Sequence, residues 1–327
     1  MSDVKNGELL FVKSVKDGIP NRDPLKDSDA RRIFGEEDGR ISLSDVSIKR
    51  DVRDYILKRF TQPGADPDKR YFVFVREERT DDGKLLGRES LANSMLAEAG
   101  RDKQKNQVKA IMETAFDARV FGIVYSVKKT SFHKTGPVQF GWAHSLHPVE
   151  SKYVQGTVVM PAKDIVVAAD DTSEGKTQGT IWTTYIVPFA VFAMPGVINS
   201  SIAVETGMNQ DDVDVLLEGL WRGTSHRQAR GRGLQQPLFL MHVEYSDPFF
   251  RIGYLEDYME LEPAGREQWL GPNPPSSLAS VSLDVTRLAH LLSPVGIYKN
   301  KIARIRYWAN PELKIIGNIP GERQEIW

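Results

Sequence analysis

The hydrophobic positions of this chain follow two different periods, which predict strands and helices in alternation. Short runs rich in β-branched and aromatic residues are typical of buried strands, because they have strand length and no polar face. Such runs lie at residues 8–15 (ELLFVKSV), 71–78 (YFVFVREE) and 237–245 (PLFLMHVEY), and alternating positions in residues 136–150 (GPVQFGWAHSLHPVE) also predict strand structure.

Between these runs the period changes to that of a helix. Ile48, Val52, Tyr55 and Ile56 recur at i, i+4, i+7 and i+8, so they share one face of a helix that Ser44 or Asp45 can cap. Residues 208–223 (MNQDDVDVLLEGLWRG) predict a second helix, with a cap at Asn209 and acids in its first turn. Helices recurring between strands predict an α+β fold, a sheet with helices on one face, as in ferredoxin-like or RNA-recognition-motif domains.

Residues 151–184 break this alternation. Apolar residues there are interspersed with Gly, Asp, Ser and Thr, a composition that favours a projecting hairpin over a buried core element.

The composition limits the possible functions. The chain has 327 residues, 40% of them hydrophobic, and a formal net charge of -1, so any nucleic-acid site must be a local basic patch. It contains no cysteine, which excludes disulfides, thiolate metal sites and cysteine nucleophiles. No leader-like N-terminus and no apolar run of about 20 residues is visible, so we expect a cytoplasmic protein without a membrane segment.

Two basic clusters stand out in this near-neutral chain. Lys49, Arg50 and Arg53 lie in one sector of the first predicted helix, beside its apolar face, where guanidinium groups suit phosphate contacts. The alternative is an ordinary solvated face, since Asp51 and Asp54 offer charge pairs. The second cluster places three arginines among glycines, where a flexible surface loop is the alternative. These residues are Arg227, Arg230 and Arg232.

The motifs that surround these clusters resemble, in the same order, the repeated backbone subunit of type I CRISPR surveillance (Cascade) complexes, most closely the type I-B branch. The resemblance covers residues 8–247 and is carried by KDGIPNRDP, SLSDVSIKRDVRDYIL, DARVFG, GPVQFGWAHSLHPVE, YIVPFAVFAMPGVINSSIAVETG, LWRGT and PLFLMHVEYSD.

The resemblance implies a non-catalytic subunit that polymerises along one CRISPR RNA and presents it for pairing with target DNA. It implies a palm like an RNA-recognition motif from residues 1–150 and 185–327, a finger insertion near residues 79–105, and a thumb from residues 151–184. Val46 stands where some relatives carry glutamine. The resemblance maps Ser44, Lys49, Arg50 and Arg53 onto contacts with the guide RNA, and we also expect RNA contacts at Arg22, Arg40, Arg227, Arg230 and Arg232. The implied thumb wedge is Val159 and Met160.

The resemblance also implies partners and the absence of a cofactor. The expected partners are CRISPR RNA, target DNA, further copies of the chain, the large, small and repeat-processing endonuclease subunits of Cascade, and a recruited helicase-nuclease. No metal or other cofactor is expected.

Two other classes of function stay open. Asp170 and Asp171 could share a hard cation, as in a metal-dependent ribonuclease of the related type III backbone kind, although paired acids are more often turn residues. His144 and His147 are spaced so that their rings would face opposite sides of a strand, which disfavours a metal site. A structural homopolymer without nucleic acid is the third class, with Trp142, Trp182 and Trp221 as interface anchors.

Overall fold

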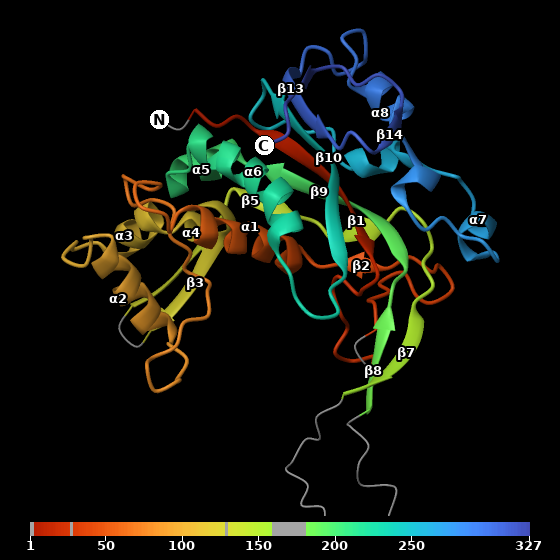
Figure 1. Ribbon diagram of the computed structural model, residues 1–327. Coiled ribbons are helices and arrows are strands. Elements are labelled where there is room, and N and C mark those ends of the chain that lie inside the picture. Colours follow the sequence, from red (N-terminus) through yellow and green to blue (C-terminus); the bar gives the residue numbers. More distant parts are fainter. Residues whose placement is uncertain (1–2, 27–28, 128–129, 159–180) are drawn as a thin grey trace, which may run out of the picture.

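The computed structural model describes residues 3–26, 29–127, 130–158 and 181–327. Within these ranges the centre is an eight-stranded sheet in which β1 (Gly7–Lys16) lies between β9 (Phe189–Ile198) and β10 (Leu234–Tyr245), antiparallel to both (Figure 1). On the β10 side the sheet continues with β13 (Ile302–Ala309) and β15 (Glu322–Arg323). On the β9 side lie β5 (Val138–Phe140), β6 (Ala143–Ser145) and β2 (Ser42–Leu43).

The central strand is apolar on both faces because both faces are covered. Every residue of β1 except Lys16 is buried. Leu9 and Phe11 pack into one hydrophobic cluster, whereas Leu10 and Val12 pack into another on the opposite side. This accounts for the continuous apolar run in the sequence, which an exposed sheet face would have interrupted with polar residues.

Helices α1 (Asp45–Arg59) and α6 (Gln210–His226) cover the face of the sheet that carries Leu9 and Phe11. The short helix α5 (Ser200–Thr206) lies beside α6 in Figure 1. The two longer helices approach closely at Gly223, where a Cβ atom would lie 2.4 Å from the backbone oxygen of Asp51. The predicted cap of α6 is present, since Asn209 and Asp212 form a reciprocal capping box.

The second face of the sheet is covered by a C-terminal layer, drawn in blue in Figure 1. Leu255, Leu283 and Leu288 of this layer pack against Leu10 and Met241 of the sheet. Its elements are η1 (Leu255–Tyr258), β11 (Glu260–Glu262), α7 (Arg266–Leu270), η2 (Leu278–Ser280), β12 (Ser282–Asp284), α8 (Thr286–Leu291) and β14 (Lys314–Ile316).

A third hydrophobic cluster lies apart from the sheet, in the orange and yellow region of Figure 1. It is formed by α2 (Arg88–Glu98), α3 (Gln107–Thr114), α4 (Phe116–Phe121) and the hairpin of β3 (Gly122–Val127) and β4 (Thr130–Thr135). The charged segment after Glu78 thus contributes α2 to a small core of its own.

The strand predicted at residues 71–78 is wrong. Apart from a single bridge between Phe72 and Ala115, this segment pairs with no strand of the described chain. The side chain of Asp117 accepts the backbone N–H groups of Phe74 and Val75, at 2.7 and 3.0 Å. A buried carboxylate therefore satisfies the donors that a neighbouring strand would otherwise pair.

The predicted excursion begins and ends as a hairpin. Strands β7 (Lys152–Thr157) and β8 (Ile181–Ile186) pair antiparallel and extend away from the sheet (Figure 1). Val159, Met160, Asp170 and Asp171 lie outside the described residues.

The mixed α/β architecture expected from the sequence is confirmed. Among the described helices, none has the length and apolar character needed to cross a membrane.

Candidate nucleic-acid interface

One open groove of about 440 Å³ gathers seven of the nine expected RNA-contact residues. It lies at the N-terminal end of α1, between the segment that follows β1 and the loop that precedes β10. None of the described residues that line it is acidic, whereas six arginines do so. These arginines are Arg22, Arg50, Arg53, Arg227, Arg230 and Arg232, and Ser44 also lines the groove.

A buried charge cluster lies under this groove. The carboxylate of Asp51, which is 0% exposed, pairs with Lys13 at 3.2 Å, Arg227 at 2.9 Å and Arg232 at 2.6 Å. These three cations and Asp51 carry a formal charge of +2, and Arg227 also pairs with Asp54 at 3.4 Å. Because buried charges are weakly screened, this excess makes the groove attractive to anions.

The pKa values in the cluster follow from burial and the surrounding charges. Burial alone would raise the pKa of Asp51, but the nearby Lys13, Arg232 and Arg227 outweigh it and hold the pKa below its usual value. Burial lowers the pKa of Lys13 to about 8, despite the attraction of Asp51. Asp51 is therefore ionised at neutral pH, while Lys13 approaches titration just above it.

The surroundings of Arg232 contradict the flexible surface loop that was the alternative interpretation of the second basic cluster. It is only 4% exposed, and it donates to Asp51 and to the side chain of Gln235 at 3.1 Å. Its Nε and Nη1 atoms have no hydrogen-bond partner among the described residues. A buried guanidinium with unused donors gains from an incoming anionic oxygen.

Arg53 lines the groove but is anchored inside the protein. Its Nε donates to Asp117 at 2.8 Å, and its guanidinium lies 5.5 Å from the centre of the Phe121 ring. Because Asp117 also holds the backbone of Phe74 and Val75, this pair connects α1 to the opposite wall of the groove. The side chain is a structural link as well as a source of positive charge.

Arg22 and Arg230 connect the groove to strand β8 of the β7–β8 hairpin. Arg22 donates to Thr184 Oγ1 at 3.0 Å, and Arg230 lies 5.6 Å from the centre of the Trp182 ring. Trp182 crosses directly over Gly156, where a Cβ atom would lie 2.4 Å from the indole. Both arginines thus contact the hairpin that the sequence predicted at residues 151–184.

Arg50 is more accessible than Lys49 and Arg53 of the same helix, with a side chain 41% exposed and paired with Asp54 at 2.6 Å. Ser44 is the N-cap residue of α1, but its hydroxyl makes no capping hydrogen bond. Both groups face the groove and can exchange their present surroundings for a ligand.

Lys49 and Arg40 do not line this groove. Lys49 pairs with Asp45 at 2.7 Å and lies 5.8 Å from the Phe121 ring centre, on the side of α1 that faces Gln139. Arg40 binds Asp38 through two nitrogen atoms and covers the ring of Phe34.

The two histidines weighed as metal ligands make internal contacts. His147 accepts the backbone N–H of Val191 at Nε2, so its Nδ1 donates to the carbonyl of Pro148. Burial lowers the pKa of His147 to about 4, and its ring stacks on Trp269 at 3.5 Å. His144 bonds to Ser42. No group of three or more potential metal ligands occurs in the described ranges.

Sequence reasoning missed Lys13, Asp51, Asp117 and Asn21, which position or line the groove. A lysine within the apolar run ELLFVKSV was the available signal, because a buried lysine needs a counter-charge. The charge pattern around Asp51 is typical of a solvated face, yet Asp51 lies on the side of α1 that carries the buried residues.

The family described as CRISPR-associated protein Cas7 matches residues 5–286. A protein of that description from Haloferax volcanii is 25% identical over 350 aligned residues, which span 100% of this chain and 94% of the relative.

Solved structures share the fold. A chain of a CRISPR RNA-guided surveillance complex in a pre-nicking state superimposes with a TM-score of 0.57 at 14% identity, covering 98% of this chain and 96% of that one. A chain of a second CRISPR RNA-guided surveillance complex gives 0.53 at 13% identity, with 98% and 95% covered.

Proposed function

The chain belongs to the Cas7 family of CRISPR-associated proteins, and from this membership we propose that it is an RNA-binding backbone subunit of a type I Cascade complex. Copies of it bind one CRISPR RNA side by side and hold it for pairing with target DNA. The observation that carries the proposal is the arginine-lined groove, which gathers cations from separate segments and no acid among the described lining residues.

The groove suits a polynucleotide backbone. Several arginines in a row match successive phosphates, and bidentate guanidinium contacts fix the position of a strand without reading its sequence. The N-terminus of α1 adds to this, because Ser44, Val46 and Ser47 line the groove where the helix dipole is positive. The net positive charge of the Asp51 cluster also attracts phosphates to the groove.

The proposed contact residues fall into three groups. Arg22, Arg50 and Arg230, with Ser44, contact the phosphates directly. Arg53, Arg227 and Arg232 line the groove and supply charge while holding it together. Lys49 and Arg40 lie away from this groove, so we assign their RNA contacts to strand segments beyond it.

The strand order supports a palm like an RNA-recognition motif. Strands β10, β1, β9 and then β5 or β6 lie side by side, and α1 and α6 pack on one face. Read along the chain, this is the order of a ferredoxin-like β-α-β-β-α-β unit. We propose residues 1–150 and 185–327 as the palm, with a finger near residues 79–105 and a thumb at residues 151–184 whose wedge includes Val159 and Met160.

The proposed partners are CRISPR RNA, target DNA, further copies of this chain, the large, small and repeat-processing subunits of a type I-B Cascade, and a recruited helicase-nuclease in the cytoplasm. We propose no catalytic role. The metal-dependent ribonuclease is not favoured by the comparisons, because the similar structures come from RNA-guided surveillance complexes.

The first test compares binding of a labelled single-stranded RNA at several salt concentrations. Replacing Arg22, Arg50 and Arg230 together by glutamine should lower affinity at least about tenfold and reduce the slope of log affinity against log salt by about 2. Arg79, Lys84 and Lys109, which lie outside the groove, form the matched control triple and should leave both unchanged. An equal loss of RNA affinity in both triple variants would contradict the assignment of RNA binding to the groove.

A second test addresses assembly and catalysis. Protein purified with a CRISPR RNA should protect regularly spaced fragments from ribonuclease. With magnesium and target DNA, both nucleic acids should stay intact. Cleavage that disappears when Asp170 and Asp171 are replaced by alanine would support the ribonuclease instead.

A further inference from the structure

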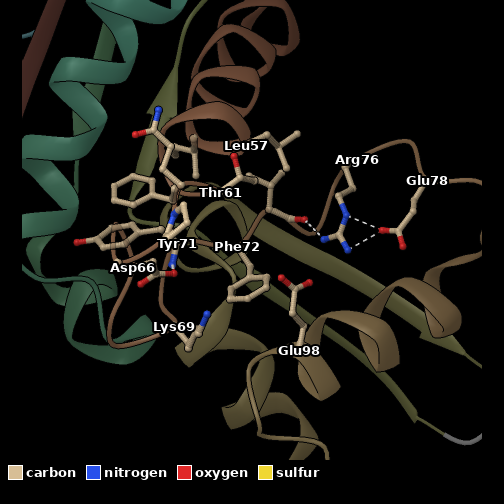
Figure 2. A pocket seen from close by; sticks show the side chains of 15 residues that line it. Leu57, Thr61, Asp66, Lys69, Tyr71, Phe72, Arg76, Glu78 and Glu98 are labelled. Atoms are coloured by element: carbon tan, nitrogen blue, oxygen red, sulfur yellow. Dashed lines mark hydrogen bonds and ion pairs between the residues drawn. The ribbon is translucent and has the colours of Figure 1, made fainter.

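A separate cavity of about 370 Å³ lies at the C-terminal end of α1, shown in Figure 2. It is connected to the arginine-lined groove by a hollow along α1. This hollow shares Arg50 and Arg227 with the groove, and Leu57, Arg76 and Glu78 with the cavity. A strand that leaves the groove along α1 therefore reaches the cavity.

The cavity has aromatic walls. Phe60 and Tyr71 stack with ring centres 4.2 Å apart and an angle of 14° between their planes. Phe72 is half-buried against the third hydrophobic cluster, and Figure 2 shows its ring between Lys69 and Glu98. These flat apolar surfaces suit a flat aromatic ligand.

Among the described residues, the polar side chains of the cavity include both partnered and unpartnered groups. Asp66 accepts the backbone N–H groups of Arg70 and Tyr71, and Arg76 pairs with Glu78 at 2.7 Å. Lys69 and Glu98, by contrast, have no side-chain partner in the described part of the chain, and neither is joined to a neighbour in Figure 2. One donor and one acceptor are thus available beside the Phe72 ring.

The wall that carries Lys69 is held in place. Lys69 has a positive φ of 54°, which is strained for a residue with a side chain. Arg101 donates to the carbonyls of Lys69 and Asp68, at 2.5 and 2.9 Å, and Arg70 pairs with Asp212 at 3.2 Å. Side chains from other elements therefore keep this backbone conformation, as expected of a preformed site.

We propose that this cavity binds one unstacked nucleobase of the RNA held in the groove, an inference that rests on the proposed function. Every base offers a π-face to Phe72, a hydrogen-bond donor to Glu98 and an acceptor to Lys69. The cavity consequently accepts any of the four bases, as a protein that carries guides of arbitrary sequence requires.

Photocrosslinking tests this assignment. A short single-stranded RNA carries one 4-thiouridine, placed at each position in turn, and is irradiated after binding to the full-length protein. One position should crosslink to residues 71–76, the tryptic peptide between Arg70 and Arg76. Replacing Phe72→Leu should reduce this crosslink by about tenfold, because the stacking surface is lost.

Matched variants separate the cavity from the fold. Phe132→Leu changes another half-buried ring of the same hydrophobic cluster and should keep the crosslink. Glu98→Gln combined with Lys69→Met should weaken it, whereas Glu89→Gln on the same helix should not.

Each outcome decides one point. Crosslinks confined to the groove, with RNA affinity intact, would overturn the base site and leave the proposed function standing. Loss of the 71–76 crosslink on adding adenosine monophosphate, without RNA release, would support the base site, because the free nucleotide would then displace the RNA base from the cavity. Failure to bind RNA at all would overturn the proposed function itself.

Discussion

Replacing Asp51→Asn should destabilise the protein and leave its affinity for RNA intact or higher. In the native chain one buried carboxylate faces Lys13, Arg227 and Arg232 at 2.6 to 3.2 Å. The amide keeps the shape of the side chain but changes the formal charge of the cluster from +2 to +3. Two of the three cations are almost fully buried, so solvent cannot compensate.

Removing one partner from a buried ion pair typically costs about 3–5 kcal/mol, because the remaining charge stays desolvated. For a chain of this size that corresponds to a fall in Tm of about 4–7 °C. The matched control is Asp54→Asn. Asp54 is 23% exposed and pairs with Arg50 and Arg227 at the surface, so its loss should cost at most about 1 kcal/mol.

The assay is thermal unfolding followed by circular dichroism, together with RNA binding well below the lower Tm. Bound RNA should restore much of the lost Tm in Asp51→Asn, because phosphates supply the missing negative charge. Equal stability of the two variants, or weaker RNA binding by Asp51→Asn at a temperature where it is folded, would show that the cluster does not act as argued.

Three further predictions follow from the same contacts. Because burial holds the pKa of Lys13 at about 8 in the folded state, below its ordinary value of 10.5, the unfolded chain binds more protons above pH 8. Stability of the native protein relative to Lys13→Met should therefore rise by about 1–2 kcal/mol between pH 8 and 9.5 in urea titrations, and a flat difference would show that burial does not lower the pKa of Lys13. His147 has a folded-state pKa of about 4 against an ordinary 6.5, so stability should fall as pH drops from 6.5 to 4, and His147→Gln should show a shallower fall in acid titrations. Gly223→Ala should cost about 1–3 kcal/mol, since its methyl group would meet the backbone of α1. Gly219→Ala should cost less, because the nearest atom to its methyl group is a side-chain methyl carbon of Val52 at 3.1 Å, and similar losses of stability in both variants would contradict the tight helix contact.

The sequence predicted those features whose cause is local. The period of Ile48, Val52 and Tyr55 predicted α1, and all three are buried. The run at residues 71–78 has the same apolar look as β1 but forms no strand, because its backbone donors are taken by Asp117, more than 40 positions away. Nothing within the run itself indicates that partner.

The arginine-lined groove could likewise be predicted from the sequence only in part. Sequence reasoning identified the arginines that line the groove, since basic clusters in a neutral chain are visible without coordinates. It could not separate the exposed Arg50 and Arg230 from the buried Arg232, whose partner Asp51 is 181 positions distant. The cavity beyond α1 was not visible at all, because it forms only when residues 56–78 fold back on themselves beside Glu98 of α2.

The position of β1 in the sheet has a consequence for how the chain reaches its native state. Gly7 pairs with Ile198 on one side and with Glu244 on the other, so the first strand waits for partners that follow about 190 and 240 residues later. During synthesis at about 5–20 residues per second, this apolar strand stays unpaired for many seconds. The region around α2, α3 and β3 has its own local core and can fold early. We therefore expect newly made chains to depend on chaperones until β10 has emerged from the ribosome.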